Sequence, residues 1–401
     1  MSSESLTLTQ LDAALRGSHA ALRLKIPLEP AGGPGDKVFP PTYEGGKYAV
    51  ERRKLGAVEM ETVLLDSVAS QANRMEQALR DAWDAGRLEL PNLTLHFGEK
   101  NAHIGTLTAL DAPHRIADAI LRDSLYQGVP FRQSKPGQSF TLARPHNATA
   151  VFELCPTALL FGVWDSTGPA GGLGAKFARV LVSEVVGFDA VAGKRVSSRL
   201  DPLQIALGAG PVYEHPTDGW TLDEREALRD EKKKNDPRKK GDGKPSEINH
   251  GNVTPSIADG GYTVREARQL SVLSLAGLRR LRFPLAGKTQ PERDQAARLL
   301  LACLGLCALR LQLEQGFDLR SRCQLVPTQP PQFELVSALG EPPQPFTLSV
   351  DQALSLYADA VSRVRAHGFQ FQAEPLRLEP SPKLLQLLDR SVALLMKSRE
   401  V

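Results

Sequence analysis

Residues 21–28 read ALRLKIPL, with an apolar side chain at every second position from Leu22 to Leu28. This alternation is typical of a β-strand that buries one face and leaves the other polar. Residues 63–83 read VLLDSVASQANRMEQALRDAW, where apolar residues instead recur at spacings of three and four. That period predicts an amphipathic helix with one buried stripe. Strand and helix patterns mix in this way along the chain, which favours an α/β or an α+β sandwich.

Four later stretches continue the mixture. Residues 150–164 are strongly apolar and predict a central hairpin, whereas residues 176–186 fit either a strand or a short helix. Residues 291–315 predict a helix with Pro291 in its first turn, and they are apolar almost all round, so this should be a core helix. Residues 350–366 predict a further helix.

The composition is that of an ordinary globular protein. Of 401 residues, 41% are hydrophobic and 24% are charged, and the net charge of +3 permits a nucleic-acid partner without arguing for one. Four cysteines do not suggest a disulfide framework. The longest apolar run, residues 299–309, is shorter than the roughly 20 residues a membrane span needs. We therefore expect a cytoplasmic protein without a membrane partner.

Two segments are too polar to form a core. Residues 29–60 begin with a Gly- and Pro-rich stretch, and residues 222–252 hold nine Lys and Arg between positions 225 and 244. The second is either a solvated mobile loop or an electrostatic tether to phosphates. We expect one elaborated domain over residues 1–401, with these two segments as insertions and residues 317–401 completing the core.

Catalytic and metal-binding patterns are missing from the sequence. Residues 168–176 read GPAGGLGAK, which resembles a phosphate-binding loop but lacks its terminal Gly-Lys-Ser/Thr. Cys303 and Cys307 are four residues apart on the predicted core helix, a spacing more typical of packing than of metal ligation. We therefore expect no catalytic residue, no metal and no cofactor.

Three groups of residues matter when they are read together. The first is LDSVASQANRME (65–76), the second is GGLGAKFAR (171–179) with VSE (182–184) and SSRLDPL (197–203), and the third is NHGNV (249–253) with SVLSLA (271–276) and LRRLRF (278–283). Together they resemble the RAMP-superfamily protein that forms the Cascade backbone in CRISPR subtype I-G, formerly I-U. The resemblance extends from about residue 21 to about residue 316.

The resemblance implies an α+β fold, with a modified RRM-like (ferredoxin-like) core, large insertions and a palm-and-thumb shape. It also implies several copies placed head to tail along one CRISPR RNA, which pairs with target DNA in antiviral defence. The large subunit and the repeat-end-binding subunit of Cascade would be further partners, and the chain itself would not be an enzyme. The sequence lacks an RNP aromatic signature, so base stacking on the sheet is not expected.

A protein that coats a guide of variable sequence must hold the sugar-phosphate backbone rather than base edges. Cationic and small polar side chains in the matched segments suit that task. The arginines near 279–282 could instead protect the edge of a strand. The polar stripe at 67–74 could instead be the solvated flank of a helix. We expect the RNA groove to be lined by Arg52, Arg53, Ser67, Gln71, Asn73, Arg74, Lys176, Arg179, Arg199, Asn249, His250, Arg279 and Arg282.

Two other functions remain open. A RAMP-type endoribonuclease that processes CRISPR RNA would use His250 or Asp201, and it would cleave repeat RNA as an isolated protein. A small-molecule enzyme of α/β type is the third possibility. The sequence offers it no catalytic constellation, and a small-molecule pocket would not need the basic segment at 222–247.

Overall fold

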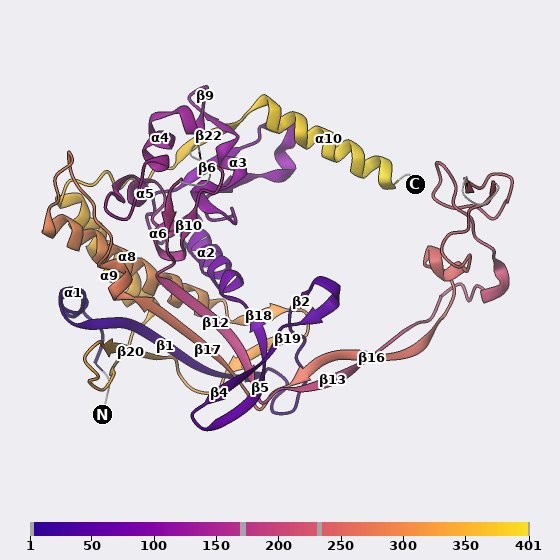
Figure 1. The fold of residues 1–401 in the computed structure, drawn as a ribbon, viewed down its shortest axis with the longest axis horizontal. Helices are drawn as coiled ribbons and strands as arrows, with labels where there is room; N and C mark the ends of the chain where they lie inside the picture. The colour runs from indigo at the N-terminus through magenta and orange to yellow at the C-terminus, as the bar shows by residue number, and fades with distance from the viewer. Residues whose placement is uncertain (1–3, 169–173, 231–234, 400–401) are drawn as a thin grey trace. The chain divides into compact units, whose positions relative to one another are not determined.

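The computed structural model divides the chain into two compact units, whereas the sequence analysis expected a single elaborated domain (Figure 1). Unit 1 consists of residues 1–191 and 262–381, and unit 2 consists of residues 192–261 and 382–401. The structure describes residues 4–168, 174–230 and 235–399.

Unit 1 is built on a nine-stranded sheet in which every neighbouring pair is antiparallel. Its main path runs β18-β19-β1-β17-β12-β5-β4, while β20 pairs with β1 and β21 pairs with β20. The strands are β1 (His19–Pro30), β4 (Val50–Leu55), β5 (Val58–Asp66), β12 (Leu181–Phe188), β17 (Glu266–Ser274), β18 (Phe317–Arg320), β19 (Cys323–Pro327), β20 (Gln332–Ser337) and β21 (Gln344–Phe346).

The strand predicted at 21–28 is β1, at the centre of this sheet. Its alternating leucines and isoleucine are buried, as the sequence pattern indicated. One edge of β1 pairs with β17 from Ala21–Ser274 to Leu28–Ala267. The other edge pairs with β19 and β20, so residues far along the chain complete the sheet around β1.

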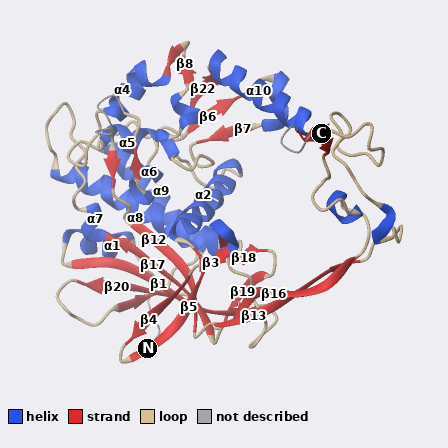
Figure 2. Cartoon of the chain, turned by 45° about the vertical axis from the view of Figure 1, so that its right-hand side comes forward, coloured by secondary structure: helices blue, strands red, loops and turns tan. Residues whose placement is uncertain are grey.

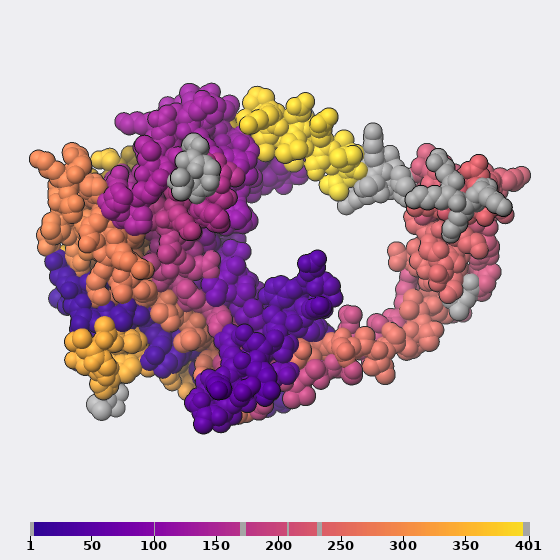
Figure 3. Space-filling model, viewed as in Figure 1, coloured from indigo at the N-terminus to yellow at the C-terminus, as the bar shows by residue number. Residues whose placement is uncertain are grey.

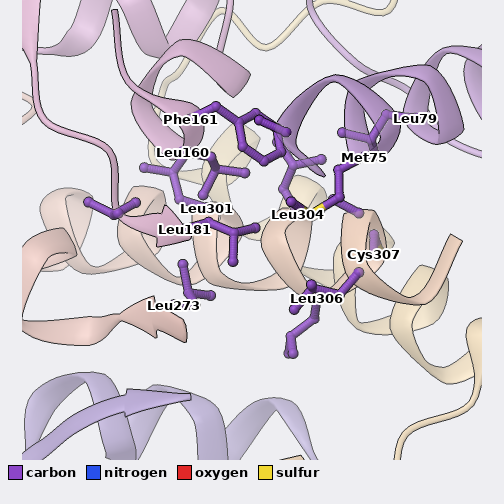
Figure 4. Packing of buried hydrophobic residues seen from close by; sticks show 14 of the residues in the cluster. Met75, Leu79, Leu160, Phe161, Leu181, Leu273, Leu301, Leu304, Leu306 and Cys307 are labelled. Atoms are coloured by element: carbon purple, nitrogen blue, oxygen red, sulfur yellow. The ribbon is translucent and has the colours of Figure 1, made fainter. Parts of the chain in front are cut away.

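Helix α8 (Pro291–Glu314) packs against α2 (Val68–Asp84) and α9 (Val350–Ala366), as Figures 1 and 2 show. It is long and apolar enough to cross a membrane, but 83% of its most apolar window is buried inside the protein, as a core helix requires. A Cβ on Gly305 would lie 3.0 Å from Leu273 of β17, so this glycine allows α8 to approach the sheet closely. Figure 4 shows leucines of α8 meeting side chains from α2, α6 (Thr157–Phe161), β12 and β17.

Two elements differ from the sequence prediction. The helix predicted at 63–83 begins at Val68, because the preceding residues belong to β5 and Ser67 caps α2 by accepting a hydrogen bond from Ser70 N at 3.2 Å. The hairpin predicted at 150–164 was wrong. Helices α5 (Thr149–Leu154) and α6 (Thr157–Phe161) occupy most of it. The residues of α6 are buried on all sides, so the apolar run lacks the alternation with polar residues that distinguishes a helix from a strand.

A smaller five-stranded sheet lies elsewhere in unit 1, in the order β7-β6-β22-β8-β9. Strands β6 and β22 are parallel, and the remaining neighbours are antiparallel. The strands are β6 (Leu93–His96), β7 (Thr106–Thr108), β8 (Ser124–Tyr126), β9 (Val129–Pro130) and β22 (Leu376–Pro380).

Unit 2 contains a long two-stranded ribbon of β13 (Val191–Arg199) and β16 (Val253–Thr263), most of whose side chains are exposed. The basic segment predicted as a linker holds short strands β14 (Arg229–Asp230) and β15 (Asp236–Pro237), although residues 231–234 lie outside the described chain. The unit also includes α10 (Pro382–Arg399).

Candidate nucleic-acid interface

An exposed aromatic ring and a lysine lie side by side on the hairpin of β10 (Val163–Trp164) and β11 (Lys176–Phe177). Trp164 is paired with Lys176 across the hairpin and is 55% exposed. The Nζ of Lys176 lies 4.9 Å from the centroid of the Trp164 ring, within range of a cation–π contact. Proteins that bind single-stranded nucleic acids combine aromatic platforms of this kind with cations that meet the phosphates.

Three arginines are anchored around the same hairpin. Arg179 follows β11 and donates from Nε to the carbonyl of Phe161 at 3.0 Å. Arg132 donates to Thr167 Oγ1 at 2.9 Å and also pairs with the carboxylate of Asp165. Arg122 approaches the same Thr167 hydroxyl at 3.3 Å. The structure therefore brings the predicted Lys176 and Arg179 together with two cations that the sequence analysis did not select.

A buried ion pair between Arg115 and Glu76 contacts the residue that precedes the hairpin. Arg115 donates to Glu76 through Nε at 2.6 Å and through Nη2 at 2.9 Å, with side-chain exposures of only 7% and 2%. Burial raises the pKa of the Glu76 carboxyl to about 7, against the opposing effect of Arg115. The Nη1 of Arg115 donates to the carbonyl of Gly162 at 3.0 Å.

Gly162 itself has a φ of 81°, a conformation that side chains rarely adopt. A Cβ at this position would lie 3.0 Å from the backbone nitrogen of Arg179. The start of the hairpin is thus fixed by a glycine and by a buried guanidinium. Of the glycine-rich stretch at 168–176, the structure describes only residues 168 and 174–176, because residues 169–173 are outside the described residues.

Gln71, predicted to face RNA, is fully buried in a polar network. Its Nε2 donates to Asp66 Oδ2 at 2.7 Å, and its Oε1 accepts from Ser183 at 2.8 Å, Gln269 at 3.0 Å and Gln312 at 3.1 Å. The amide joins α2 to β12, β17 and α8. This placement speaks against a direct RNA contact by Gln71.

The other predicted residues of α2 differ in exposure. Arg74 donates from Nε to Asp66 Oδ2 at 2.9 Å and also bonds the carbonyl of Leu319, so it ties α2 to β18. Ser67 is the half-buried cap of the helix, whereas Asn73 is exposed. Of this group, Asn73 is the residue most open to a ligand.

Arg279 and Arg282 follow the short helix α7 (Leu275–Leu278), so the alternative of a protected strand edge was wrong. Arg279 donates to the carbonyls of Ala14, Leu15 and His19 at 2.9, 2.8 and 2.6 Å. Arg282 donates to the carbonyl of Arg279 at 2.6 Å. Both arginines therefore carry structural hydrogen bonds, and those of Arg279 include the last turn of α1 (Leu8–Arg16).

Arg52 and Arg53 lie on β4, at an edge of the central sheet. Arg52 pairs with Glu59 at 2.9 Å, yet its side chain is 69% exposed, so this pair is weak and its cation is available to a phosphate. Arg53 is more enclosed and donates to Glu184 at 2.8 Å. An edge strand with this charge is also protected from pairing with other strands.

Unit 2 holds the last three predicted residues. Arg199 ends β13, Asn249 adopts a left-handed conformation with a φ of 60°, and the backbone nitrogen of His250 donates to Pro245 at 2.9 Å. The carboxylate of Asp201 accepts hydrogen bonds from the backbone of Gly251 at 2.6 Å and of Leu203 and Ile205 at 3.3 Å each.

These hydrogen bonds, chiefly that of Gly251, lower the pKa of Asp201. A carboxylate committed to the turn and held ionised in this way is a poor general base. In the part of the chain that the structure describes, there is also no group of three or more His, Cys, Asp and Glu suited to a metal ion.

The predicted residues thus belong to five different parts of the fold. Sequence reasoning missed Trp164, Arg122, Arg132 and Arg115. Trp164 was taken as the last residue of the hairpin predicted at 150–164, and nothing in the local sequence relates the three arginines to it. The five parts are β4 (Arg52, Arg53), α2 (Ser67, Gln71, Asn73, Arg74), β11 and its end (Lys176, Arg179), the end of α7 (Arg279, Arg282) and unit 2 (Arg199, Asn249, His250).

A family model described as "CRISPR-associated protein GSU0053 (Cas_GSU0053)" matches residues 22–192. The match is to a CRISPR-associated family. It confirms over this segment the CRISPR-associated identification made from the sequence, and it includes both Trp164 and Lys176. The third group of resembling residues, at 249–283, lies beyond it.

No curated protein sequence matches the chain. Among solved structures, Csc2 from Thermofilum pendens is similar at a TM-score of 0.28 and 10% sequence identity, covering 90% of this chain and 80% of that chain. A likeness of this size does not establish a shared fold.

Proposed function

We propose that this chain is the RNA-binding backbone subunit of a subtype I-G CRISPR surveillance (Cascade) complex and has no nuclease activity of its own. The observation that carries the proposal is the β10–β11 hairpin. It lies within the segment that matches a CRISPR-associated family, and it presents an exposed tryptophan and a cluster of cations.

The chemistry of the hairpin suits a guide RNA whose sequence changes from one spacer to the next. Every base has a π-face, so a stacking contact with Trp164 is tolerant of sequence. Lys176 and the neighbouring arginines would meet phosphates, which carry no sequence information. The exposed Arg52 and Asn73, together with Arg199, Asn249 and His250 of unit 2, are the further contacts that we propose.

The order of the central strands supports an RRM-like core. Strand β1 is followed by α2, β12, β17, α8 and β19, and the strands stand in the order β19-β1-β17-β12. A ferredoxin-like β-α-β-β-α-β unit places its fourth, first, third and second strands in this order. The β13–β16 ribbon is then an insertion between the second and third strands, where a thumb would be.

In this role the partners are CRISPR RNA, target DNA paired to it, further copies of the chain and the other Cascade subunits, all in the cytoplasm. The test is to purify the tagged chain with the other subunits, with and without a CRISPR array in the same cell. Large particles that protect RNA of one length class, formed only with the array, are expected. A chain that stays free of RNA when all partners and the array are present would overturn the proposal. Cleavage of repeat RNA by the isolated chain would favour the endoribonuclease.

A further inference from the structure

We propose that α10 of one copy docks into the cavity between α1 and the β20–β21 hairpin of the next copy. This inference rests on the proposed function, because that function supplies several copies in one complex. It names the two surfaces that would meet.

Helix α10, which is the yellow segment of Figure 3, carries several large apolar side chains that are exposed. Leu387 is 64% exposed and Leu394 is 68% exposed. They are seven residues apart, so they lie on the same side of the helix, two turns from each other. Arg390 and Ser391 lie between them on a shallow hollow of the same face. Exposed leucines grouped on one face of a helix are typical of a surface that is covered in an assembly.

The receiving cavity lies in unit 1 and has a volume of about 600 Å³. Helix α1 forms one wall with Gln10, Ala13 and Ala14, and the β20–β21 hairpin forms another with Leu335 and Phe346. The cavity is within the range of about 300–1,000 Å³ in which proteins bind compact apolar groups. It is therefore large enough to receive the two leucines.

The polar groups of the two surfaces are complementary. Glu4 is the one carboxylate among the described residues that line the cavity, and Arg390 stands between the leucines of α10. The Arg390 guanidinium can therefore pair with Glu4 when the leucines of α10 enter the cavity.

Both surfaces are present on every copy, and they differ from each other. A contact between two different surfaces of identical chains is heterologous, so it leaves one free cavity and one free helix at the two ends of each assembly. Such a contact adds copies in one direction. That geometry fits a protein that covers an RNA, whereas a symmetric contact between two α10 helices would stop at a dimer.

The test uses cysteine pairs in the full chain. All four native cysteines are buried, so an introduced surface cysteine would be the reactive thiol. Leu394→Cys and Gln10→Cys are prepared as separate proteins, and each is treated with a short bis-maleimide, alone and mixed. Cross-linking in the mixture alone, by at least about tenfold over either protein alone, is expected, because each variant carries only one half of the contact.

Two other outcomes of the cross-linking experiment overturn the proposal. Cross-linking of Leu394→Cys alone would identify a symmetric α10 contact. If the mixture fails to cross-link, both with and without CRISPR RNA, then α10 does not meet this cavity on another copy. Because RNA binding is measured separately on the same samples, cross-linking without RNA binding would remove the proposed function but keep the contact.

A second pair of variants does not depend on thiol chemistry. Leu387→Glu and Leu394→Glu should each weaken association of copies roughly ten- to a hundredfold, since each removes a leucine from an apolar site. Leu142→Glu is the matched control, because this leucine is 71% exposed but belongs to neither surface. Equal association by all three variants in analytical ultracentrifugation would contradict the inference.

Discussion

Replacing Trp164 or Lys176 with alanine should weaken RNA binding in two distinguishable ways. The ring of Trp164 is 55% exposed and the Lys176 ammonium lies 4.9 Å from its centroid, so a base can stack on the ring by displacing the ammonium. Stacking depends little on salt, whereas a phosphate contact releases counterions and is therefore salt-dependent. The two substitutions should consequently change different parameters of the same binding isotherm.

The magnitudes follow from these contacts. Stacking of a base on an aromatic side chain is worth about 1–3 kcal/mol. A base that stacks on Trp164 competes with the Lys176 cation–π contact, which is worth about 0.5–1 kcal/mol at an exposed site. We therefore expect Trp164→Ala to cost about 1–2 kcal/mol, roughly a five- to thirtyfold loss of affinity. Lys176→Ala should reduce the slope of log K against log salt by about 0.7, the value for one phosphate of a single strand.

The assay is a fluorescence-anisotropy titration with guide RNA at four or more salt concentrations. Trp164→Phe should retain most of the affinity, since it keeps a stacking face. Lys288→Ala changes the net charge by the same amount as Lys176→Ala at another exposed position, and it should leave the slope unchanged. A Trp164→Ala protein with native affinity, or a slope that falls equally for both lysine variants, would refute the interface.

Three further predictions concern stability. Asp66→Ala should lower the free energy of unfolding in urea by about 3 kcal/mol, the low end for breaking a buried ion pair. The loss is at the low end because the Arg74 and Arg320 side chains are 30% and 26% exposed and can turn to water, and a loss under about 1 kcal/mol would contradict this. The pKa of Glu76 is about 7 when folded and near 4.5 when unfolded, so the folded state binds the extra proton and stability should fall as pH rises from about 4.5 to 7. The native protein should therefore melt at a lower temperature at pH 8 than at pH 5, and Glu76→Gln should remove this difference. The same pH dependence of the melting temperature in both proteins would disprove the assignment. Gly162→Ala should cost about 1–3 kcal/mol by the same urea assay, since its φ of 81° would strain any side chain; unchanged stability would show that the hairpin can relax.

The parts of the fold that could be read from the sequence are those with a local signal. Strand β1 alternates because only one of its faces is buried, and α8 begins with a proline and continues as a long apolar segment. The junction at Ser67 was misread because Leu64 of β5 and Val68 of α2 are spaced by four, as on one helix. A spacing pattern cannot tell one element from two elements joined at a cap.

The candidate site was less predictable because its contacts are distant in sequence. Gln71 lies at the edge of a helical stripe that looks amphipathic, and only β12, β17 and α8 make that edge an interior one. Lys176 was found through the family resemblance. Trp164 was hidden within an apolar run, and its exposure depends on how the short hairpin leaves α6.

The position of β1 in the sheet also constrains how the protein can be made. This strand leaves the ribosome long before its partners β17, β19 and β20, which lie roughly 240 to 320 residues later in the chain, a delay of about 12–64 seconds at ordinary rates of synthesis. During that time its apolar face has no sheet to join. A nascent chain that ends before β17 leaves β1 without a partner strand, although β4, β5 and β12 can already pair with one another. The apolar face of β1 must therefore stay shielded until the later strands have been made.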